Sequence, residues 1–437
     1  MKKFLFLLIL FFCTLSNICA AKGISLIRDT EIESVLTSYA QKIFKAANLN
    51  PNNARVLIIN DDSFNAFVVG GHTIFVHSGL LTQSNHVDDL MFVLSHETGH
   101  IAGGHITRGI GALEQANATA LISTILGGLV AVAGRPDAGV AVMMGGNTSA
   151  AGLYTSYRQT EESSADRIAA DIMQKTGYSM LGFQNTMKLI KMQDRLTPQD
   201  EWNYLRTHPL SQNRVSALSR FLKNPQPLHE DIRFELIKAK LIGFLYPPYH
   251  TFDVFKNQNT LPALYALSIA HYRNRNLNQS LKIIDQLIKA KPNFPYFYEL
   301  KAQFLFETGQ IEPAITYYDK ALEFISKAPL IRLSLAQALL ETNSQTNASR
   351  AISELKQVLS YDSQIPFAWQ LLATAYERTN QTHLIPYAMA ELYLTHKDIK
   401  SAQKMAKKAL TTLSKESPEY IRSQDILSLS IPKKSNF

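Results

Sequence analysis

Cysteine is nearly absent from this 437-residue chain, since the only two, Cys13 and Cys19, lie close to the N-terminus. If the N-terminal segment is removed during export, the remaining chain can form no disulfide bond and offers no thiolate to a metal ion. A metal site in the rest of the chain must therefore be built from histidine and carboxylate side chains.

Charge is also sparse. Charged residues make up 18% of the chain and hydrophobic residues 46%, a composition typical of a folded protein with a buried core. The formal net charge of +8 falls by two if Lys2 and Lys3 are removed with the leader. This mild basic excess does not indicate nucleic-acid binding, but it leaves open a peripheral contact with an anionic membrane surface.

The N-terminus has the pattern of a secretory signal peptide. The basic start Met1–Lys3 is followed by the apolar run Phe4–Phe12 and by small residues at Cys19–Ala21. We therefore expect residues 1–21 to be cleaved and the mature chain to be secreted. An uncleaved anchor is the alternative, which the shortness of the apolar run disfavours.

The most informative stretch is the HExxH motif His96-Glu97-Thr98-Gly99-His100. The preceding residues Val87–Leu94 have the apolar spacing and early aspartates of a helix start. On a helix, residues four apart leave the same face, so the two imidazoles can bind one zinc ion. Glu97 lies beside that face and can take a proton from the attacking water.

A zinc site with two histidines needs a third protein ligand. His105 lies nine residues after His96, about half a turn from the shared face of a continuous helix, so we expect it beside the metal rather than on it. Glu161 and Glu162 begin a later helix, and spacing alone does not choose between them. Asp166 shares a face with Glu162 and can accept a hydrogen bond from a ligand imidazole.

Upstream of the motif, Phe64–Val69 and His72–His77 flank Gly70-Gly71, which predicts a β-hairpin. An edge strand of such a hairpin can pair with an extended peptide through main-chain hydrogen bonds. The alternative is that the hairpin only covers the core.

The C-terminal half has an internal repeat. Apolar and small residues recur at an offset of 34, for example Leu277 with Ile311, Ser280 with Ala314, and Ile284 with Tyr318. This is the period of tetratricopeptide repeats, of which we expect about four. Such arrays bury a core between neighbouring repeats and leave a concave face for a partner.

Taken together, the chain resembles the HtpX-like and CAAX-prenyl-protease-like zinc metallopeptidases. The resemblance rests on HExxH, on Glu-x-x-x-Asp some sixty residues later, and on upstream motifs that include Gly79-Leu80-Leu81. The leader and the repeats make it most similar to the periplasmic beta-barrel assembly-enhancing protease group. The resemblance implies His96, His100 and Glu162 as ligands of one zinc ion, Glu97 as the general base, and Asp166 as the partner of a ligand imidazole.

The same resemblance implies roles for two further segments. Asn65, Ala66 and Phe67 would form the substrate-binding edge strand. Thr207–Leu210 and Arg214 also match a family segment, in which His208 would lie near the metal. That histidine would either stabilise the oxyanion or occupy the open zinc position and hold the enzyme latent.

We therefore expect an α+β, mostly helical fold, with a zinc metallopeptidase domain containing a small β-sheet followed by a helical solenoid. The expected limits are a signal peptide at 1–21, the peptidase domain at 22–230, a connecting helix and linker at 231–260, tetratricopeptide repeats at 261–430, and a disordered tail at 431–437. The apolar residues 118–153 are expected to pack on the peptidase domain, with a mobile or membrane-touching cover as the alternative.

The predicted function is a periplasmic zinc endopeptidase in outer-membrane protein quality control and assembly. Its substrates would be unfolded or misassembled proteins, and its repeats would contact the outer-membrane assembly machinery. One rival is a repeat-based chaperone or adaptor with a latent metal site. The other is a membrane-integral processing peptidase.

Overall fold

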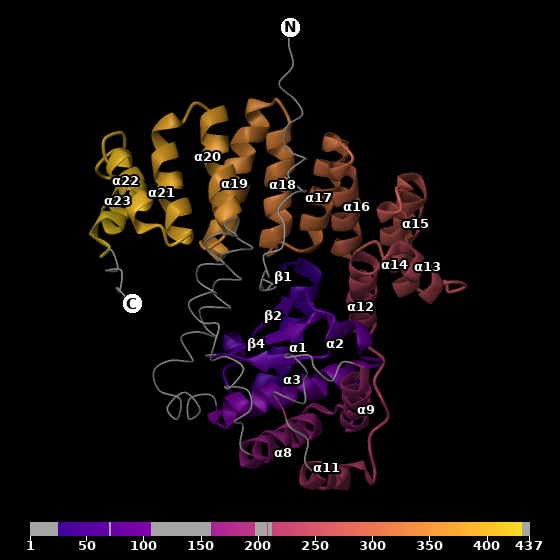
Figure 1. The fold of residues 1–437 in the computed structure, drawn as a ribbon. Helices are drawn as coiled ribbons and strands as arrows, with labels where there is room; N and C mark the ends of the chain where they lie inside the picture. The colour runs from indigo at the N-terminus through magenta and orange to yellow at the C-terminus, as the bar shows by residue number, and fades with distance from the viewer. Residues whose placement is uncertain (1–24, 70, 106–158, 197–207, 209–211, 431–437) are drawn as a thin grey trace, which may run out of the picture.

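The computed structural model describes residues 25–69, 71–105, 159–196, 208 and 212–430. The expected signal peptide, the apolar stretch 118–153 and the tail 431–437 lie outside these residues. Within them, a group of helices surrounds a small sheet, and an arch of paired helices lies across one end of that group (Figure 1). The predicted fold class, α+β and mostly helical, is confirmed.

The sheet has four strands in the order β1-β2-β4-β3: β1 (Leu26–Ile27), β2 (Arg55–Ile59), β3 (Ala66–Val68) and β4 (Thr73–His77). β3 and β4 pair antiparallel with Phe67 opposite Phe75, so the predicted hairpin is present. β2 runs parallel to β4. β3 is therefore an edge strand among the described strands, as its proposed role requires.

Helix α1 (Thr30–Ala46) covers one face of this sheet. Asp29 caps the helix by accepting a hydrogen bond from the backbone of Ile32 at 2.9 Å. Its buried residues recur at helical spacing and join the alternate residues of β2 and β4 in one core; they include Ile32, Leu36, Tyr39 and Phe44. A short helix, η1 (Pro51–Asn53), leads into β2.

Helix α3 (Val87–Ala102) is the central element of the peptidase half. Its residues from Val87 to His100 are all buried, because helices and sheet surround it. It follows α2 (Ser78–Gln83), packs against α8 (Gln159–Thr176) and α9 (Leu181–Leu196), and lies against β3. The short helices α11 (Gln212–Ser219) and η2 (Arg220–Leu222) lie beyond α8 (Figure 1).

The C-terminal arch contains five helical pairs within the described residues, one more than the sequence predicts. The pairs are α14 (Leu261–Arg273) with α15 (Leu277–Ala290), α16 (Pro295–Glu307) with α17 (Ile311–Phe324), α18 (Pro329–Glu341) with α19 (Gln345–Tyr361), α20 (Pro366–Arg378) with α21 (Ile385–Thr395), and α22 (Ile399–Ala409) with α23 (Pro418–Ser428). The later pairs were harder to recognise because η3 (Thr382–Leu384) interrupts the spacing between α20 and α21.

Helix α12 (Ile232–Leu245) joins the two halves and is followed by α13 (Pro248–Val254). It packs on α1 and α2 on one side and on α14 on the other. Among the helices that the structure describes, none has both the length and the apolar character needed to span a bilayer.

A buried charge cluster lies at this junction. The Lys240 ammonium lies 2.7 Å from Asp29 Oδ2 and 3.3 Å from Glu31 Oε2. Tyr265 of the first repeat donates a hydrogen bond of 2.7 Å to Glu31, and Glu299 approaches Lys240 to 4.0 Å. Three carboxyl groups thus surround one ammonium group. If all three were ionised, the buried cluster would carry a net negative charge, which destabilises the fold unless some of the carboxyl groups keep their protons.

Burial raises the pKa of Glu31 to about 7 and that of Glu299 to about 8, because the attraction of Lys240 offsets only part of the desolvation. Both groups have an ordinary pKa of 4.5. The folded protein therefore keeps protons that the unfolded chain has already released, so its stability falls as pH rises from that value toward 7 or 8.

We predict that replacing both groups, Glu31→Gln with Glu299→Gln, weakens this pH dependence. The free energy of unfolding of the wild type should fall between about pH 5 and about pH 8 by several kcal/mol, up to about 6 kcal/mol, more than that of the double variant. Asp29 remains in the variant to pair with Lys240. Urea titrations at the two pH values measure the difference, with the exposed changes Glu312→Gln and Glu323→Gln as the matched control. Equal pH dependence in the wild type and the junction variant would contradict the prediction.

Candidate metal centre

Helix α3 presents two imidazoles from one face. His96 and His100 are buried, and their Nε2 atoms lie 3.1 Å apart. The spacing of four residues predicts this placement, and the buried setting of α3 removes both rings from bulk water.

Helix α8 brings a carboxylate to the same point. Glu162 places Oε2 3.3 Å from His96 Nε2 and Oε1 3.3 Å from His100 Nε2. Its neighbour Glu161 is not part of the group. Sequence spacing did not decide which of the two glutamates is the ligand. In the structure it is Glu162, the residue that the family resemblance implied, that lies beside the two imidazoles.

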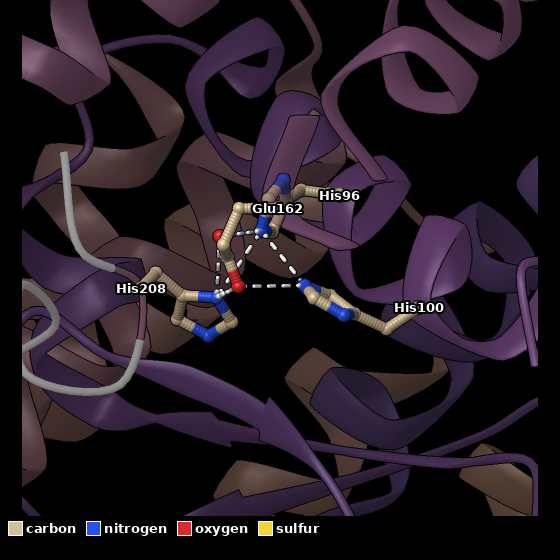
Figure 2. A group of neighbouring side chains, drawn as sticks. All are labelled: His96, His100, Glu162 and His208. Carbon is tan, nitrogen blue, oxygen red and sulfur yellow. Dashed lines mark hydrogen bonds and ion pairs between the residues drawn. The ribbon is translucent and has the colours of Figure 1, made fainter. Parts of the chain in front are cut away.

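His208 completes the cluster from a distant part of the chain (Figure 2). Its Nδ1 lies 3.2 Å from His96 Nε2 and 3.2 Å from Glu162 Oε1. The four side chains, His96, His100, Glu162 and His208, are all buried. Each offers one ligand atom, and these four atoms lie within 4.8 Å of one another.

These separations fit a tetrahedral zinc ion. Ligand atoms at about 2.0–2.1 Å from zinc in a tetrahedron lie about 3.3–3.4 Å from each other. Of the six pairs that these four residues form, five have ligand atoms 3.1–3.3 Å apart, and the whole set lies within 4.8 Å. The donor set of imidazole nitrogens and one carboxylate is also the set that zinc accepts, so the residues present fit the metal that the sequence implies.

The other nitrogens of the ligand rings are held in place. His96 Nδ1 lies 3.0 Å from Asp166 Oδ1, and His100 Nδ1 lies 3.1 Å from His105 Nδ1. Asp166 thus lies where the sequence predicts. His105 lies behind His100 and outside the four-residue group, as its spacing suggested.

The cluster favours positive charge at its centre. Burial disfavours the charged imidazole, but the hydrogen bonds and charges of Asp166 and Glu162 raise the pKa of His96 to about 10. Burial lowers the pKa of His100 to about 3, so this imidazole is neutral at ordinary pH, the form in which histidine binds a metal ion. Although burial opposes it, the surrounding histidines hold the pKa of Glu162 far below its usual value, so this carboxylate is ionised.

Arg214 of α11 ties the two acidic residues of α8 together. Its guanidinium donates to Asp166 at 2.7 and 2.9 Å and approaches Glu162 Oε2 to 2.9 Å. It also donates to the carbonyl of His208 at 3.4 Å, and it is only 4% exposed. The family segment around His208 had drawn attention to Arg214, but its role as a clamp on Asp166 and Glu162 is visible only in three dimensions.

Glu97 lies at the edge of the cluster, where a base is needed. Its Oε1 lies 3.3 Å from His208 Nε2, and its side chain is buried. Burial raises the pKa of Glu97, although the positive charges of His208 and His96 partly offset the shift. A carboxyl group of raised pKa is suited to accept a proton and to return it.

The predicted substrate residues lie beside this helix. Asn65, Ala66 and Phe67 are buried, and β3 lies against α3 at the edge of the described sheet. The Phe67 ring stacks on Phe75 with centroids 5.2 Å apart. His77 contacts Phe67 edge-on and bonds to Ser63 rather than joining the metal cluster.

Gly99, inside the HExxH motif, has a structural role that the sequence did not reveal. A Cβ atom at this position would lie 2.7 Å from the carbonyl oxygen of Ala165 and 2.9 Å from its Cα. The backbones of α3 and α8 are therefore in direct contact at Gly99 and Ala165, next in sequence to His100 and three residues after Glu162. Only a residue without a side chain permits this approach.

The chain matches known families in both halves. Residues 27–222 match the model of Peptidase family M48, and residues 295–327 match a tetratricopeptide repeat model. The beta-barrel assembly-enhancing protease of Yersinia pestis is 24% identical over 78% of this chain and 72% of its own length. That of Escherichia coli K12 is 24% identical over 84% and 76%, and the E. coli metalloprotease LoiP is 26% identical over 38% and 62%. These matches confirm the family resemblance inferred from the motifs.

We predict that Gly99→Ala separates α3 from α8. The added methyl group meets backbone rather than a flexible side chain, so the helices must shift and Glu162 must move away from the histidines. We expect a loss of about 1–3 kcal/mol in stability together with weaker metal binding. Competition with a chromophoric chelator measures the affinity, and Ser163→Ala on α8 is the control. Unchanged affinity in Gly99→Ala would show that the close crossing does not position the site.

Proposed function

We propose that this chain, a metallopeptidase with an M48 peptidase domain followed by tetratricopeptide repeats, is a zinc-dependent endopeptidase of the periplasm. The observation that carries the proposal is the buried convergence of His96, His100, Glu162 and His208 next to Glu97. In the same proposal the domain limits are 22–230 for the peptidase, 231–260 for the connector and 261–430 for the repeats.

In this proposal His96, His100 and Glu162 hold the zinc ion. Bound zinc would supply Lewis acidity, which polarises the scissile carbonyl and makes water more acidic. Asp166 orients the His96 ring through its Nδ1, and Arg214 keeps Asp166 ionised and fixed.

Glu97 is proposed as the general base. It accepts a proton from the attacking water and then delivers that proton to the nitrogen of the leaving amine, so no net proton is consumed by the side chain. Its burial beside the cluster supports this assignment, because burial raises the pKa of Glu97 and so makes its carboxylate a stronger base than an exposed one.

The substrate is proposed to be an extended polypeptide that lies along β3. A strand at the edge of a sheet can add a peptide as a further strand, and β3 is the outer strand of the described sheet, where an added peptide would place a scissile bond next to helix α3. Asn65, Ala66 and Phe67 supply this edge. Main-chain pairing recognises an unfolded chain rather than one particular sequence, which suits substrates that have failed to fold.

His208 is proposed to hold the enzyme latent. Its Nδ1 lies in the fourth corner of the cluster, and a catalytic zinc site needs that corner open for water or substrate. This placement favours the blocking role over an oxyanion role, because the ring points at the metal position itself. Its displacement would open the site.

The cellular role is inferred from the relatives, which are named as proteases that enhance beta-barrel assembly. We propose that this chain acts in outer-membrane protein assembly, where it cleaves unfolded or misassembled proteins. Its repeats would contact the assembly machinery, since such arrays bind protein partners.

A second candidate function is a repeat-based chaperone or adaptor with a latent metal site. The closed four-residue cluster favours it, because structural zinc sites also have four protein ligands and no open position. The two functions differ in whether Glu97 has a chemical role.

We predict that Glu97→Gln lowers cleavage of an unfolded substrate such as casein by at least about 100-fold while zinc content stays near that of the wild type. The exposed change Glu323→Gln is the control, and a chelator should stop cleavage by the wild type. If Glu97→Gln cleaves casein at the wild-type rate, or if the wild type never cleaves it even when His208 is replaced, the adaptor function is favoured.

We predict that His208→Ala increases casein cleavage several-fold, because the fourth position of the metal site becomes open. The increase should vanish in the double variant with Glu97→Gln, which excludes a contaminating protease. A fall in cleavage at unchanged zinc content would instead assign His208 to the oxyanion.

A further inference from the structure

The outermost described helical pair, α22 with α23, carries an unusual charge pattern on its first helix. Residues 399–415 contain five lysines and no acidic residue. Four of them lie on α22 and are exposed; we call them the lysine stripe: Lys400, Lys404, Lys407 and Lys408. None of the four forms an ion pair with any residue that the structure describes.

The lysine stripe lies on one side of the helix. The buried residues of α22 are Ala402, Ala406 and Ala409, which face the rest of the array. At about 100° per residue, the stripe occupies the opposite side of the helix. α22 and α23 are the last described elements of the array and lie at its far end (Figure 1). The stripe is therefore a continuous basic face directed away from the array.

Elsewhere in the array, charged side chains form ion pairs with one another, unlike those of the lysine stripe. Arginines pair with specific carboxylates of neighbouring helices, as in Arg332 with Glu354 and Arg422 with Glu391. An arginine fork recognises one carboxylate in one geometry, whereas a lysine is a mobile point charge on a flexible stem. Four unpaired lysines without an arginine fit a diffuse negative surface better than a defined set of carboxylates.

The neighbouring helix adds exposed apolar side chains. Ile421 of α23 is 54% exposed, and Leu429, just beyond that helix, is 38% exposed. Gln403 of α22 holds the end of this segment through a hydrogen bond of 2.8 Å to the Leu429 carbonyl. The Gln403 bond places the exposed Leu429 beside the helix that carries the lysine stripe. Basic residues with an exposed apolar side chain beside them are a combination by which peripheral proteins attach to a bilayer interface.

We propose that the lysine stripe of α22 docks the array on an anionic phospholipid surface. The attraction is between lysine ammonium groups and lipid phosphates, and it decays within about 10 Å at 0.1 M salt. Binding at this end would hold the peptidase half near a membrane without any spanning segment. The proposal does not depend on the peptidase activity.

Flotation with lipid vesicles tests the proposal. Wild type is compared with a stripe variant, Lys400→Gln, Lys404→Gln, Lys407→Gln and Lys408→Gln, and with a control that removes equal charge at exposed lysines elsewhere, Lys282→Gln, Lys289→Gln, Lys291→Gln and Lys327→Gln. All three proteins share the same N-terminus, so any contribution of the leader is common to them. Glutamine keeps helix propensity, and circular dichroism checks the fold.

We expect the wild type and the control to float with vesicles that contain phosphatidylcholine and phosphatidylglycerol. Neither should float with vesicles of phosphatidylcholine alone. The partition coefficient of the stripe variant should be at least about tenfold lower, and added salt should weaken wild-type binding. Glu97→Gln should float as wild type does, which separates this result from the peptidase proposal.

Two outcomes would overturn the proposal. One is equal flotation of the stripe variant and the control. The other is that the wild type binds neither kind of vesicle but binds polyglutamate beads through the same lysines. That result would assign the lysine stripe to an acidic protein partner.

Discussion

The metal centre depends on how closely α3 and α8 approach each other. His96 and His100 come from one helix and Glu162 from the other, so no local sequence feature joins them. Gly99 allows the backbone of α8 at Ala165 to lie where a side chain would otherwise be. A shift of one ångström between these helices would break the 3.3 Å spacing between Glu162 and the imidazoles. Packing in the core is therefore the precondition for the chemistry.

The second requirement is charge balance in a buried place. Glu97, Glu162 and Asp166 are acidic, and Arg214 is the permanent cation among them. Uncompensated charge in the interior is costly, so a divalent cation between the imidazoles would complete the balance when the carboxylates are ionised. The raised pKa of His96, which burial opposes and which Asp166 and Glu162 cause, reflects the same demand for positive charge.

The sequence predicted local features well because they depend on helical and strand spacing. The spacing of four residues predicted the HExxH motif on a helix, and the alternation of two residues predicted the hairpin around Gly71. The offset of 34 residues predicted the first repeats. The choice of Glu162 over Glu161 did not follow from spacing, since both begin the same helix and only the packing of α8 decides which one points inward. The family resemblance supplied that choice.

Long-range features could not be read from spacing at all. His208 and Arg214 lie 46 and 48 residues from their partners on α8, and neither has a local pattern that indicates a buried charge. The junction of Lys240 with Asp29 and Glu31 joins segments more than 200 residues apart and was not foreseen. The lysine stripe was hidden because its members are spaced along a helix and form a face only when the helix is built.

The central claim is that Glu162, with His96 and His100, binds zinc. The most direct test is the zinc-to-protein ratio of the purified wild type, of Glu162→Gln, and of Glu161→Gln, whose altered side chain lies next in sequence but outside the cluster. We predict about one zinc per chain in the wild type and in Glu161→Gln, and a large loss in Glu162→Gln. Equal zinc content in the two variants would contradict the account.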